Sequence, residues 1–285
     1  MPRYDKGVRA LVLFVCALAG CDGVFGLNGH AETPIDGGLD ARIDAEPCAP
    51  GAMHWLTAGH PELGNDLSDP TLVESGLELF ASRSGVLVHA SRSSLTEPFS
   101  VPEPITFLGR VGNFMDVDPA LTEDGNILVF SSRTSDGVYE STRMGSVWST
   151  PILVLARSPD AGLDLSPDGT ILYFSAGTLS RFTRGNTGAG FISPIDLGID
   201  VEFPTLTEDG KRIYYNEVGD GTIHTATRGN GLQPFPAGRV VMFDDAPLIA
   251  MDLDASVDGK RLVMNAPISL EGSDTVIAIM TRVCD

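Results

Sequence analysis

The most regular feature of the hydrophobic pattern is a turn that ends in glycine and leads into a short apolar strand. This combination occurs five times, and the glycines are spaced 49, 44, 41 and 49 residues apart. The strand is apolar at successive positions, which predicts burial on both of its faces. The copies are Glu74-Ser75-Gly76 before Leu79-Phe80, Glu123-Asp124-Gly125 before Leu128-Val129-Phe130, Pro167-Asp168-Gly169 before Leu172-Tyr173-Phe174, Glu208-Asp209-Gly210 before Ile213-Tyr214-Tyr215, and Val257-Asp258-Gly259 before Leu262-Val263-Met264.

Two further markers follow in register with the first. A hydroxyl residue and an arginine end a later strand of each copy, at Ser91-Arg92, Thr142-Arg143, Thr183-Arg184, Thr227-Arg228 and Thr281-Arg282. In four copies an aromatic residue near a proline comes next, at Pro98-Phe99, Trp148 with Pro151, Phe191 with Pro194, and Pro234-Phe235-Pro236. Turn residues divide each copy into four strands, which we expect at 114–121, 127–131, 138–143 and 147–155 in the second copy.

Repeats of about 45 residues with four strands each are typical of a β-propeller. The sequence therefore predicts an all-β fold, a five-bladed propeller of four-stranded antiparallel blades. The fifth copy stops at Thr281-Arg282 without the aromatic marker, so its blade would leave an open edge. The segment before the first copy, with Trp55 and Pro61, has the missing marker. We expect the N- and C-terminal strands to close the ring together in the last blade.

The second and third copies resemble the TolB-type propeller repeat. The resemblance lies in Asp118-Pro119 leading into Leu121-Thr122-Glu123-Asp124-Gly125 and Phe130-Ser131-Ser132-Arg133, and most closely in the run 165–175. It covers about residues 66–282 and implies the fold far more than an activity. The residues ahead of the repeats are too few for the α/β domain that precedes the propeller in TolB. The resemblance therefore assigns no binding role to particular residues.

The N-terminus has the charge order of a secretory signal. Arg3, Lys6 and Arg9 precede an apolar and small run from residue 10 to residue 20, which is too short to span a bilayer. The run ends in Leu18-Ala19-Gly20-Cys21, which resembles the bacterial lipoprotein cleavage box and implies acylation of Cys21. An ordinary signal peptide that happens to precede a cysteine is the alternative. Lipidation would anchor the domain to a membrane.

The domain organisation follows from these features. We expect a lipoprotein signal peptide at 1–20, a lipidated cysteine and flexible acidic linker at 21–47, and the propeller at 48–285. Residues 22–47 contain five glycines and six acidic side chains but only one basic one, without helical or strand periodicity. Removal of residues 1–20 takes away three basic and one acidic side chain and changes the formal charge from −19 to −21. Such a surface repels phosphate backbones, which argues against nucleic acid as a partner.

No catalytic or cofactor signature is present in the sequence. It has no Gly-x-Ser-x-Gly elbow, His-Glu-x-x-His pair, phosphate loop or Cys-x-x-Cys. We therefore expect no cofactor and no metal, and favour a protein that is not an enzyme. The five histidines lack ligand spacing, and the marker arginines are expected to form ion pairs with turn acids of their own blades. Asp124, Asp168, Asp209 and Asp258 are expected to form turns.

One column of acids is the candidate for catalysis. Asp69, Asp118 and Asp252 each stand seven residues before a turn glycine, and Gly162 and Phe203 hold that position in the other two copies. Carboxylates from separate blades that converge on the propeller axis could hydrolyse a glycan. The favoured alternative is a structural role, because a repeat produces recurring acids through hydrogen bonds to neighbouring amides. The pairs Asp116/Asp118 and Asp252/Asp254 lack the further oxygen ligands of a calcium loop.

These observations favour a lipid-anchored binding or scaffold module of the cell envelope over a glycan hydrolase. The expected partner is an envelope protein or a cell-wall ligand that loops of a monomeric propeller recognise. We expect export to a periplasm-facing or surface position, with the outer membrane favoured over the inner one.

The last two cysteines are predicted to form a disulfide. Cys48 and Cys284 flank the repeat array and would lie in an oxidising compartment, although two free thiols are the alternative. A bond between them would fasten the two strands of the last blade and stabilise the fold by about 5 kcal/mol on the chain-entropy model. Peptide mapping without reductant should recover the linked peptides, and Cys284→Ser should lower the free energy of unfolding. Recovery of both cysteines as free thiols would contradict the prediction.

Overall fold

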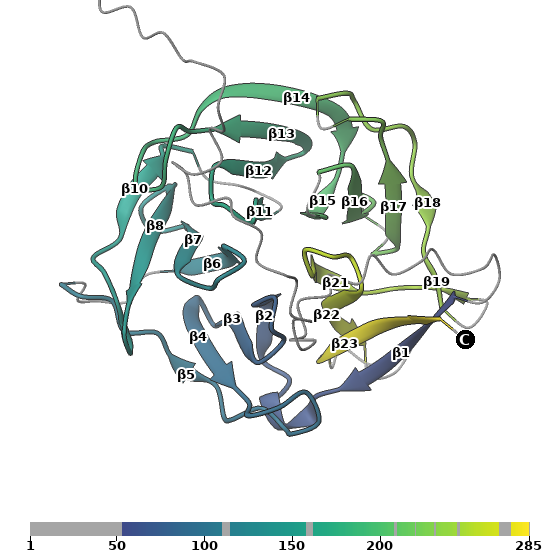
Figure 1. Ribbon diagram of the computed structural model, residues 1–285, viewed down its shortest axis with the longest axis horizontal. Helices are drawn as coiled ribbons and strands as arrows, with labels where there is room; N and C mark the ends of the chain where they lie inside the picture. Colours follow the sequence, from purple (N-terminus) through teal and green to yellow (C-terminus); the bar gives the residue numbers. More distant parts are fainter. Residues whose placement is uncertain are drawn as a thin grey trace, which may run out of the picture. The chain divides into compact units, whose positions relative to one another are not determined.

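The computed structural model describes residues 53–109, 115–157, 162–207, 210–219, 221–230, 232–243, 246–267 and 275–284. Five antiparallel sheets of at least four strands surround a central axis, as predicted (Figure 1). Blade 1 contains β2 (Leu67–Leu72), β3 (Glu78–Arg83), β4 (Val86–Ser91) and β5 (Glu103–Pro104). Blade 2 contains β6 (Asp116–Leu121), β7 (Ile127–Ser132), β8 (Gly137–Met144), β9 (Val147–Trp148) and β10 (Ile152–Leu155).

The remaining blades follow in chain order. Blade 3 contains β11 (Leu163–Leu165), β12 (Ile171–Ala176), β13 (Thr178–Thr183) and β14 (Ile192–Asp200), and blade 4 contains β15 (Glu202–Leu206), β16 (Arg212–Asn216), β17 (Ile223–Thr227) and β18 (Arg239–Val240). Blade 5 contains β21 (Met251–Ala255), β22 (Arg261–Pro267), β23 (Thr275–Cys284) and β1 (Met53–Gly59). A short 3₁₀ turn (Pro61–Leu63) and the hairpin of β19 (Met242–Phe243) and β20 (Ala246–Pro247) lie between blades in sequence.

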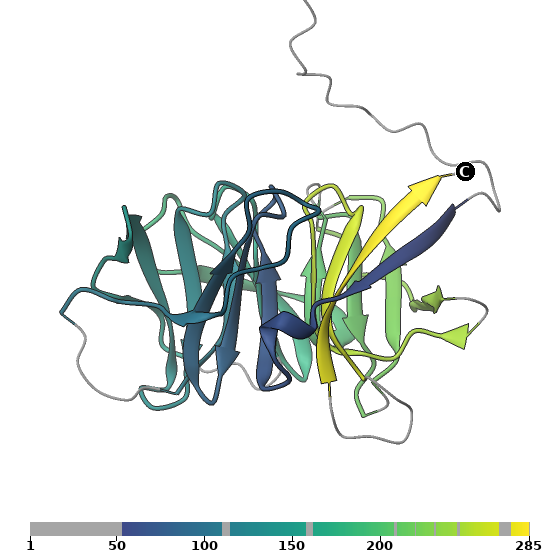
Figure 2. The ribbon, with the colours of Figure 1, turned by 90° about the horizontal axis from the view of Figure 1, so that it is seen from below.

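The ring closes as the sequence predicts. Strand β1 pairs antiparallel with β23 over seven residues, from Met53 opposite Cys284 to Gly59 opposite Ala278 (Figure 2). The N-terminal segment therefore supplies the outer strand that the fifth repeat lacks. Cys21 and Cys48 lie outside the described residues, as does the side chain of Cys284, so the disulfide stays a prediction.

The outer strand of blade 2 differs from the expected 147–155. It is broken into β9, which pairs with the end of β8, and β10, which pairs with the middle of β8. Pro151 lies at the break, where its missing N–H group cannot continue the hydrogen-bonded ladder.

Hydrophobic contacts lie between blades and not at the axis. In β3, Leu79 and Ala81 pack against blade 5, while Phe80 packs against Leu128 and Phe130 of blade 2. Three more clusters of this kind join blades 2 and 3, 3 and 4, and 4 and 5. The second strand of every blade is thus buried on both faces, which explains its run of apolar residues.

The two later sequence markers contact each other. The guanidinium groups of Arg92, Arg184 and Arg228 lie 4.1–4.4 Å from the ring centroids of the aromatic residues that follow them, and each Nε donates to the carbonyl of the turn glycine in its own blade. These arginines therefore tie the end of the third strand to the first turn of the blade.

The prediction of ion pairs inside each blade is wrong for Arg143 and Arg184. Arg143 pairs with Glu78 of blade 1, at 2.6 Å, and Arg184 pairs with Glu140 of blade 2. These long side chains reach across to the neighbouring blade, since the turn acids Asp124, Asp168 and Asp258 are engaged in their own turns.

A second set of polar contacts crosses the blade interfaces. The residue six positions after each turn glycine is Ser or Asn, and in four blades its side chain donates to a carbonyl nine positions before the next blade's turn glycine. The pairs are Ser82 with Asp116, Ser175 with Val201, Asn216 with Ala250, and Asn265 with Leu67. The last pair joins blade 5 to blade 1. We name these four contacts the blade clasps.

Loss of the closing clasp should destabilise the ring. Asn265 donates both to the Leu67 carbonyl at 3.0 Å and to Asp252 at 2.8 Å, and it is buried. Asn265→Ala removes one buried donor from each of these acceptors, so we expect it to lower the free energy of unfolding by about 1–3 kcal/mol in urea denaturation. Asn65→Ala, at an exposed position, is the control. Equal stability of the two variants would refute a role for the clasp.

Candidate functional site

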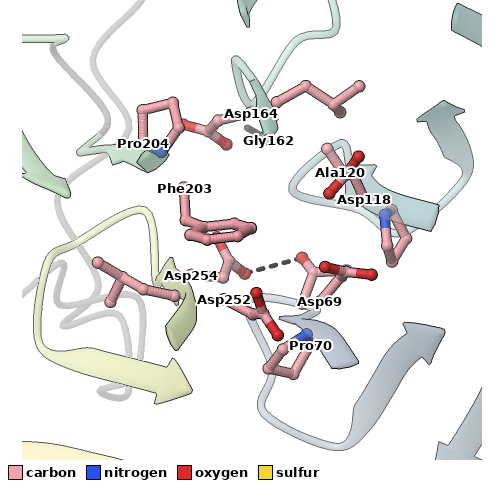
Figure 3. Close-up of a pocket in the computed structure, with 14 residues that line it drawn as sticks. Asp69, Pro70, Asp118, Ala120, Gly162, Asp164, Phe203, Pro204, Asp252 and Asp254 are labelled. Carbon is pink, nitrogen blue, oxygen red and sulfur yellow. Dashed lines mark hydrogen bonds between the residues drawn. The ribbon is translucent and has the colours of Figure 1, made fainter. Parts of the chain in front are cut away.

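The structure brings the predicted acid column to the propeller axis. Asp69, Asp118 and Asp252 line one small cavity together with Gly162 and Phe203, which hold the same position in blades 3 and 4 (Figure 3). Each belongs to the innermost strand of its blade or to the residue just before it, so all five blades contribute. The expected convergence of carboxylates from separate blades is therefore present.

A shared backbone conformation explains which residues occupy this column. All five have positive φ, between 47° and 51° for the three aspartates and Phe203 and 99° for Gly162. The register of the inner strand shifts at this point in blades 1, 2, 4 and 5, as in a β-bulge. Gly and Asp tolerate the left-handed region better than most residues, whereas a bulky aromatic such as Phe203 is an outlier there. The positive φ at these positions thus explains in part why four of the five residues are Asp or Gly.

The three aspartates are linked from blade to blade. The backbone N–H of Asp69 interacts with the carboxylate of Asp252, and the backbone N–H of Asp118 interacts with that of Asp69. Ser131 donates to Asp118 at 2.8 Å, and Asn265 donates to Asp252 at 2.8 Å. These contacts connect blades 5, 1 and 2 through their acidic side chains.

A second layer of acids, which the sequence column did not reveal, lies two residues further along the inner strands. Asp164 and Asp254 line the same cavity. Asp164 of blade 3 accepts the N–H of Leu206 in blade 4 at 2.7 Å. Asp254 of blade 5 accepts the hydroxyl of Thr71 in blade 1 at 2.7 Å and that of Thr205 in blade 4 at 3.1 Å. Each carboxylate therefore holds blades together.

Burial makes these carboxyl groups weaker acids than exposed aspartates. It raises the pKa of Asp69 well above its ordinary value, and the charges of Asp118 and Asp252 add to the shift. It raises the pKa of Asp118 to about 6, with a further contribution from Asp252, against the Ser131 hydrogen bond and Arg133. Burial also raises the pKa of Asp252, of Asp254 and, together with the charge of Asp254, of Asp164. The cluster therefore holds protons that isolated aspartates would release.

The cavity between these acids is small. Its volume is about 30 Å³, the space of roughly one water molecule. A sugar ring does not fit into it. Within the described ranges, no three acidic, histidine or cysteine side chains are arranged to hold a metal ion.

The other predicted residues lie elsewhere. His60, His89 and His224 each lie 2.8–3.0 Å from a glutamate oxygen, on different blades, while His30 and the side chain of His54 are outside the described residues. The glycine-rich run 185–190 connects β13 to β14, as expected for a blade turn. In the part of the chain that the structure describes, no helix is long and apolar enough to cross a membrane.

Solved structures share the fold at low sequence identity. A thermostable family-43 glycoside hydrolase matches with a TM-score of 0.54 and 13% identity, over 79% of this chain and 89% of that one. The glutaminyl cyclase of Myxococcus xanthus matches with a TM-score of 0.50 and 14% identity, over 81% and 97%. A putative TolB from Agrobacterium tumefaciens has a TM-score of 0.48 and 17% identity, over 78% and 80%. Some matched chains are longer, and this chain spans 62% of the matched chain of the hydrazine synthase from Kuenenia stuttgartiensis.

These matches show a propeller fold and nothing finer. No protein-family model matches the chain, and no curated protein matches it either.

The raised pKa values predict that the fold is more stable at acidic than at basic pH. Between the ordinary pKa of 3.8 and the raised value of about 6 for Asp118, the native state binds more protons than the unfolded state, so stability falls as pH rises. The full shift of Asp118 corresponds to about 3 kcal/mol, of which about half is lost between pH 5 and pH 8. Asp118→Asn should therefore be more stable than the wild type at pH 8 and show a flatter profile.

Urea denaturation from pH 5 to pH 8 measures this effect. Asp136→Asn is the matched control, because Asp136 is exposed and also has a positive φ, 49°, in the turn between β7 and β8. A wild-type stability that rises with pH, or an unchanged slope in Asp118→Asn, would rule out the assignment.

Proposed function

We propose that this protein is a lipid-anchored binding module of the bacterial cell envelope, which recognises a partner protein or a wall-associated ligand through its propeller loops. The observation that carries this proposal is the small size of the cavity at the propeller axis and the contacts of the carboxylates around it. The carboxylates that a hydrolase would use, those of Asp69, Asp118 and Asp252, surround a cavity of about 30 Å³. Those of Asp252 and Asp69 also accept backbone N–H groups of the next blade, from Asp69 and Asp118 respectively. An axis that joins blades supports a rigid scaffold.

The size of the cavity argues against hydrolysis at this point. Glycosidases place a sugar between two carboxyl groups, which lie about 5–9.5 Å apart. Ligand pockets generally enclose about 300–1,000 Å³, roughly ten times the volume available here or more. Asp254 also accepts hydrogen bonds from Thr71, Thr205 and the N–H of Leu72, which fixes its orientation.

The anchor and compartment rest on the sequence. The charged start, the apolar run and Cys21 support export and acylation, and the acidic segment 22–47 supports a tether to the membrane. Within the envelope we favour the outer membrane. The formal charge of −21 after signal removal, with three basic and one acidic side chain lost from −19, favours a partner with a basic contact surface.

Glycan hydrolysis is the second candidate function. The convergence of Asp69, Asp118 and Asp252 and the raised pKa of each support it, because a glycosidase needs a carboxyl group that is protonated near neutral pH. The likeness to a family-43 glycoside hydrolase extends to the fold alone.

Capture from an envelope extract separates the two functions. The full chain, extracted from membranes in detergent, should co-purify with a protein at fixed stoichiometry or with untrimmed wall glycan. Cells fed labelled palmitate should label the wild type but not Cys21→Ser, because Cys21 would carry the acyl chain. Asp118→Asn should capture the same partner as the wild type.

Two results would contradict the proposal. Recovery of glycan fragments that are shorter than the input, and that return to full length with Asp118→Asn, would establish hydrolysis and refute the scaffold. Equal palmitate labelling of the wild type and Cys21→Ser, or no labelling of either, would refute the lipid anchor.

A further inference from the structure

A larger cavity lies between blades 3 and 4, apart from the axial acids. It has a volume of about 330 Å³, within the range of small-molecule pockets. Ile171, Leu206 and Leu232 supply apolar walls, and Tyr173 and Arg181 supply a phenol and a guanidinium group. The two polar residues lie opposite each other on the adjacent strands β12 and β13.

Arg181 occupies a repeat position at which each of the five blades has a different residue. The residue paired with the fourth position after the turn glycine is His89 in blade 1, Glu140 in blade 2 and Arg181 in blade 3. It is Thr225 in blade 4 and Ile279 in blade 5. The position faces the following blade, as the contacts of blades 1 and 2 show.

In the two preceding interfaces an acid at or beside this position meets the marker arginine of the next blade. Glu140 pairs with Arg184, and Glu78, which also contacts His89, pairs with Arg143. At the interface of blades 3 and 4, the marker arginine of blade 4 is Arg228. The compared position of blade 3 holds Arg181, a second cation, and not an acid. The charges of Arg228 and Arg181 both act on Tyr173.

The contacts recorded for Arg181 leave its charge without a carboxylate partner among the described residues. It hydrogen-bonds to the Tyr173 side chain, and Asp164, the acid among the lining residues, accepts the N–H groups of Leu165 and Leu206. Burial raises the pKa of Tyr173 against the attraction of the two arginines, so its hydroxyl keeps its proton and can donate.

We propose that the cavity between blades 3 and 4 binds a small organic carboxylate, whose charged group contacts Arg181 and Tyr173 and whose apolar part lies against Ile171, Leu206 and Leu232. A guanidinium group binds a carboxylate through two parallel hydrogen bonds, and the phenol hydroxyl provides a third donor. The aliphatic side chains give the apolar part of the ligand a surface to bury. The proposal does not rest on the scaffold function, because it is argued only from contacts at the interface of blades 3 and 4.

The test uses the oxidised full chain and two probes of the same shape. Benzoate should bind in isothermal titration calorimetry, and the neutral benzamide should bind at least about tenfold more weakly, because only the carboxylate satisfies the guanidinium. Arg181→Gln should weaken benzoate binding by a similar factor, and Arg181→Lys should retain part of it. Arg239→Gln, at an exposed position of β18 in the neighbouring blade, should bind as the wild type does.

Arg181→Glu gives a second, independent readout. It places a negative charge where the carboxylate group would bind, so it should abolish benzoate binding while circular dichroism shows the same fold as the wild type. Failure of benzoate to bind at millimolar concentration, equal affinities for benzoate and benzamide, or unchanged affinity in Arg181→Gln would each overturn the site. None of these results bears on capture of an envelope partner.

Discussion

Each blade of this propeller buries both faces of its second strand, so no blade is complete without two neighbours. Phe80 and Leu79, adjacent in one strand, pack into the cores of two different interfaces. Hydrophobic burial of this kind is non-directional and cannot by itself fix the angle between blades. The blade clasps and the ion pairs between blades supply direction, since each joins a defined side chain to a defined group next door. The pairing of β1 with β23 then closes the ring within one blade.

The axis follows from the same constraint. Five inner strands meet there around a small cavity, and the two layers of aspartates link strands through hydrogen bonds to amide and hydroxyl groups. Buried carboxylates close together are costly when ionised, and the raised pKa values of Asp69, Asp118 and Asp164 express that cost. Protonation relieves it, so the acids act as a junction whose strength depends on pH. This role accounts for the convergence of Asp69, Asp118 and Asp252 without a substrate.

The sequence predicts the blades and their closure because both depend on local, repeated patterns. Turn glycines, apolar runs and the missing outer strand of the fifth repeat are visible without the structure. The positive φ of the column residues is harder to predict from the sequence, although a glycine, Gly162, at the same repeat position as the aspartates indicates it. Asp164 was missed, and Asp254 was considered only as part of a calcium pair, because both stand five residues before their turn glycines, outside the column. Contacts between blades, such as Arg143 with Glu78, join residues from different repeats, so no spacing within one repeat predicts them.

The most direct test of the account is the titration of the axial carboxyl groups themselves. Carbon-detected NMR of aspartate-labelled protein, assigned with Asp69→Asn, Asp118→Asn and Asp252→Asn, would follow each group as the pH changes. The account predicts that all three titrate above the ordinary value of 3.8, with Asp118 near 6 in the wild type and Asp69 shifted downward when Asp118 is replaced. Three independent titrations near 3.8 would contradict a shared, proton-holding junction at the axis.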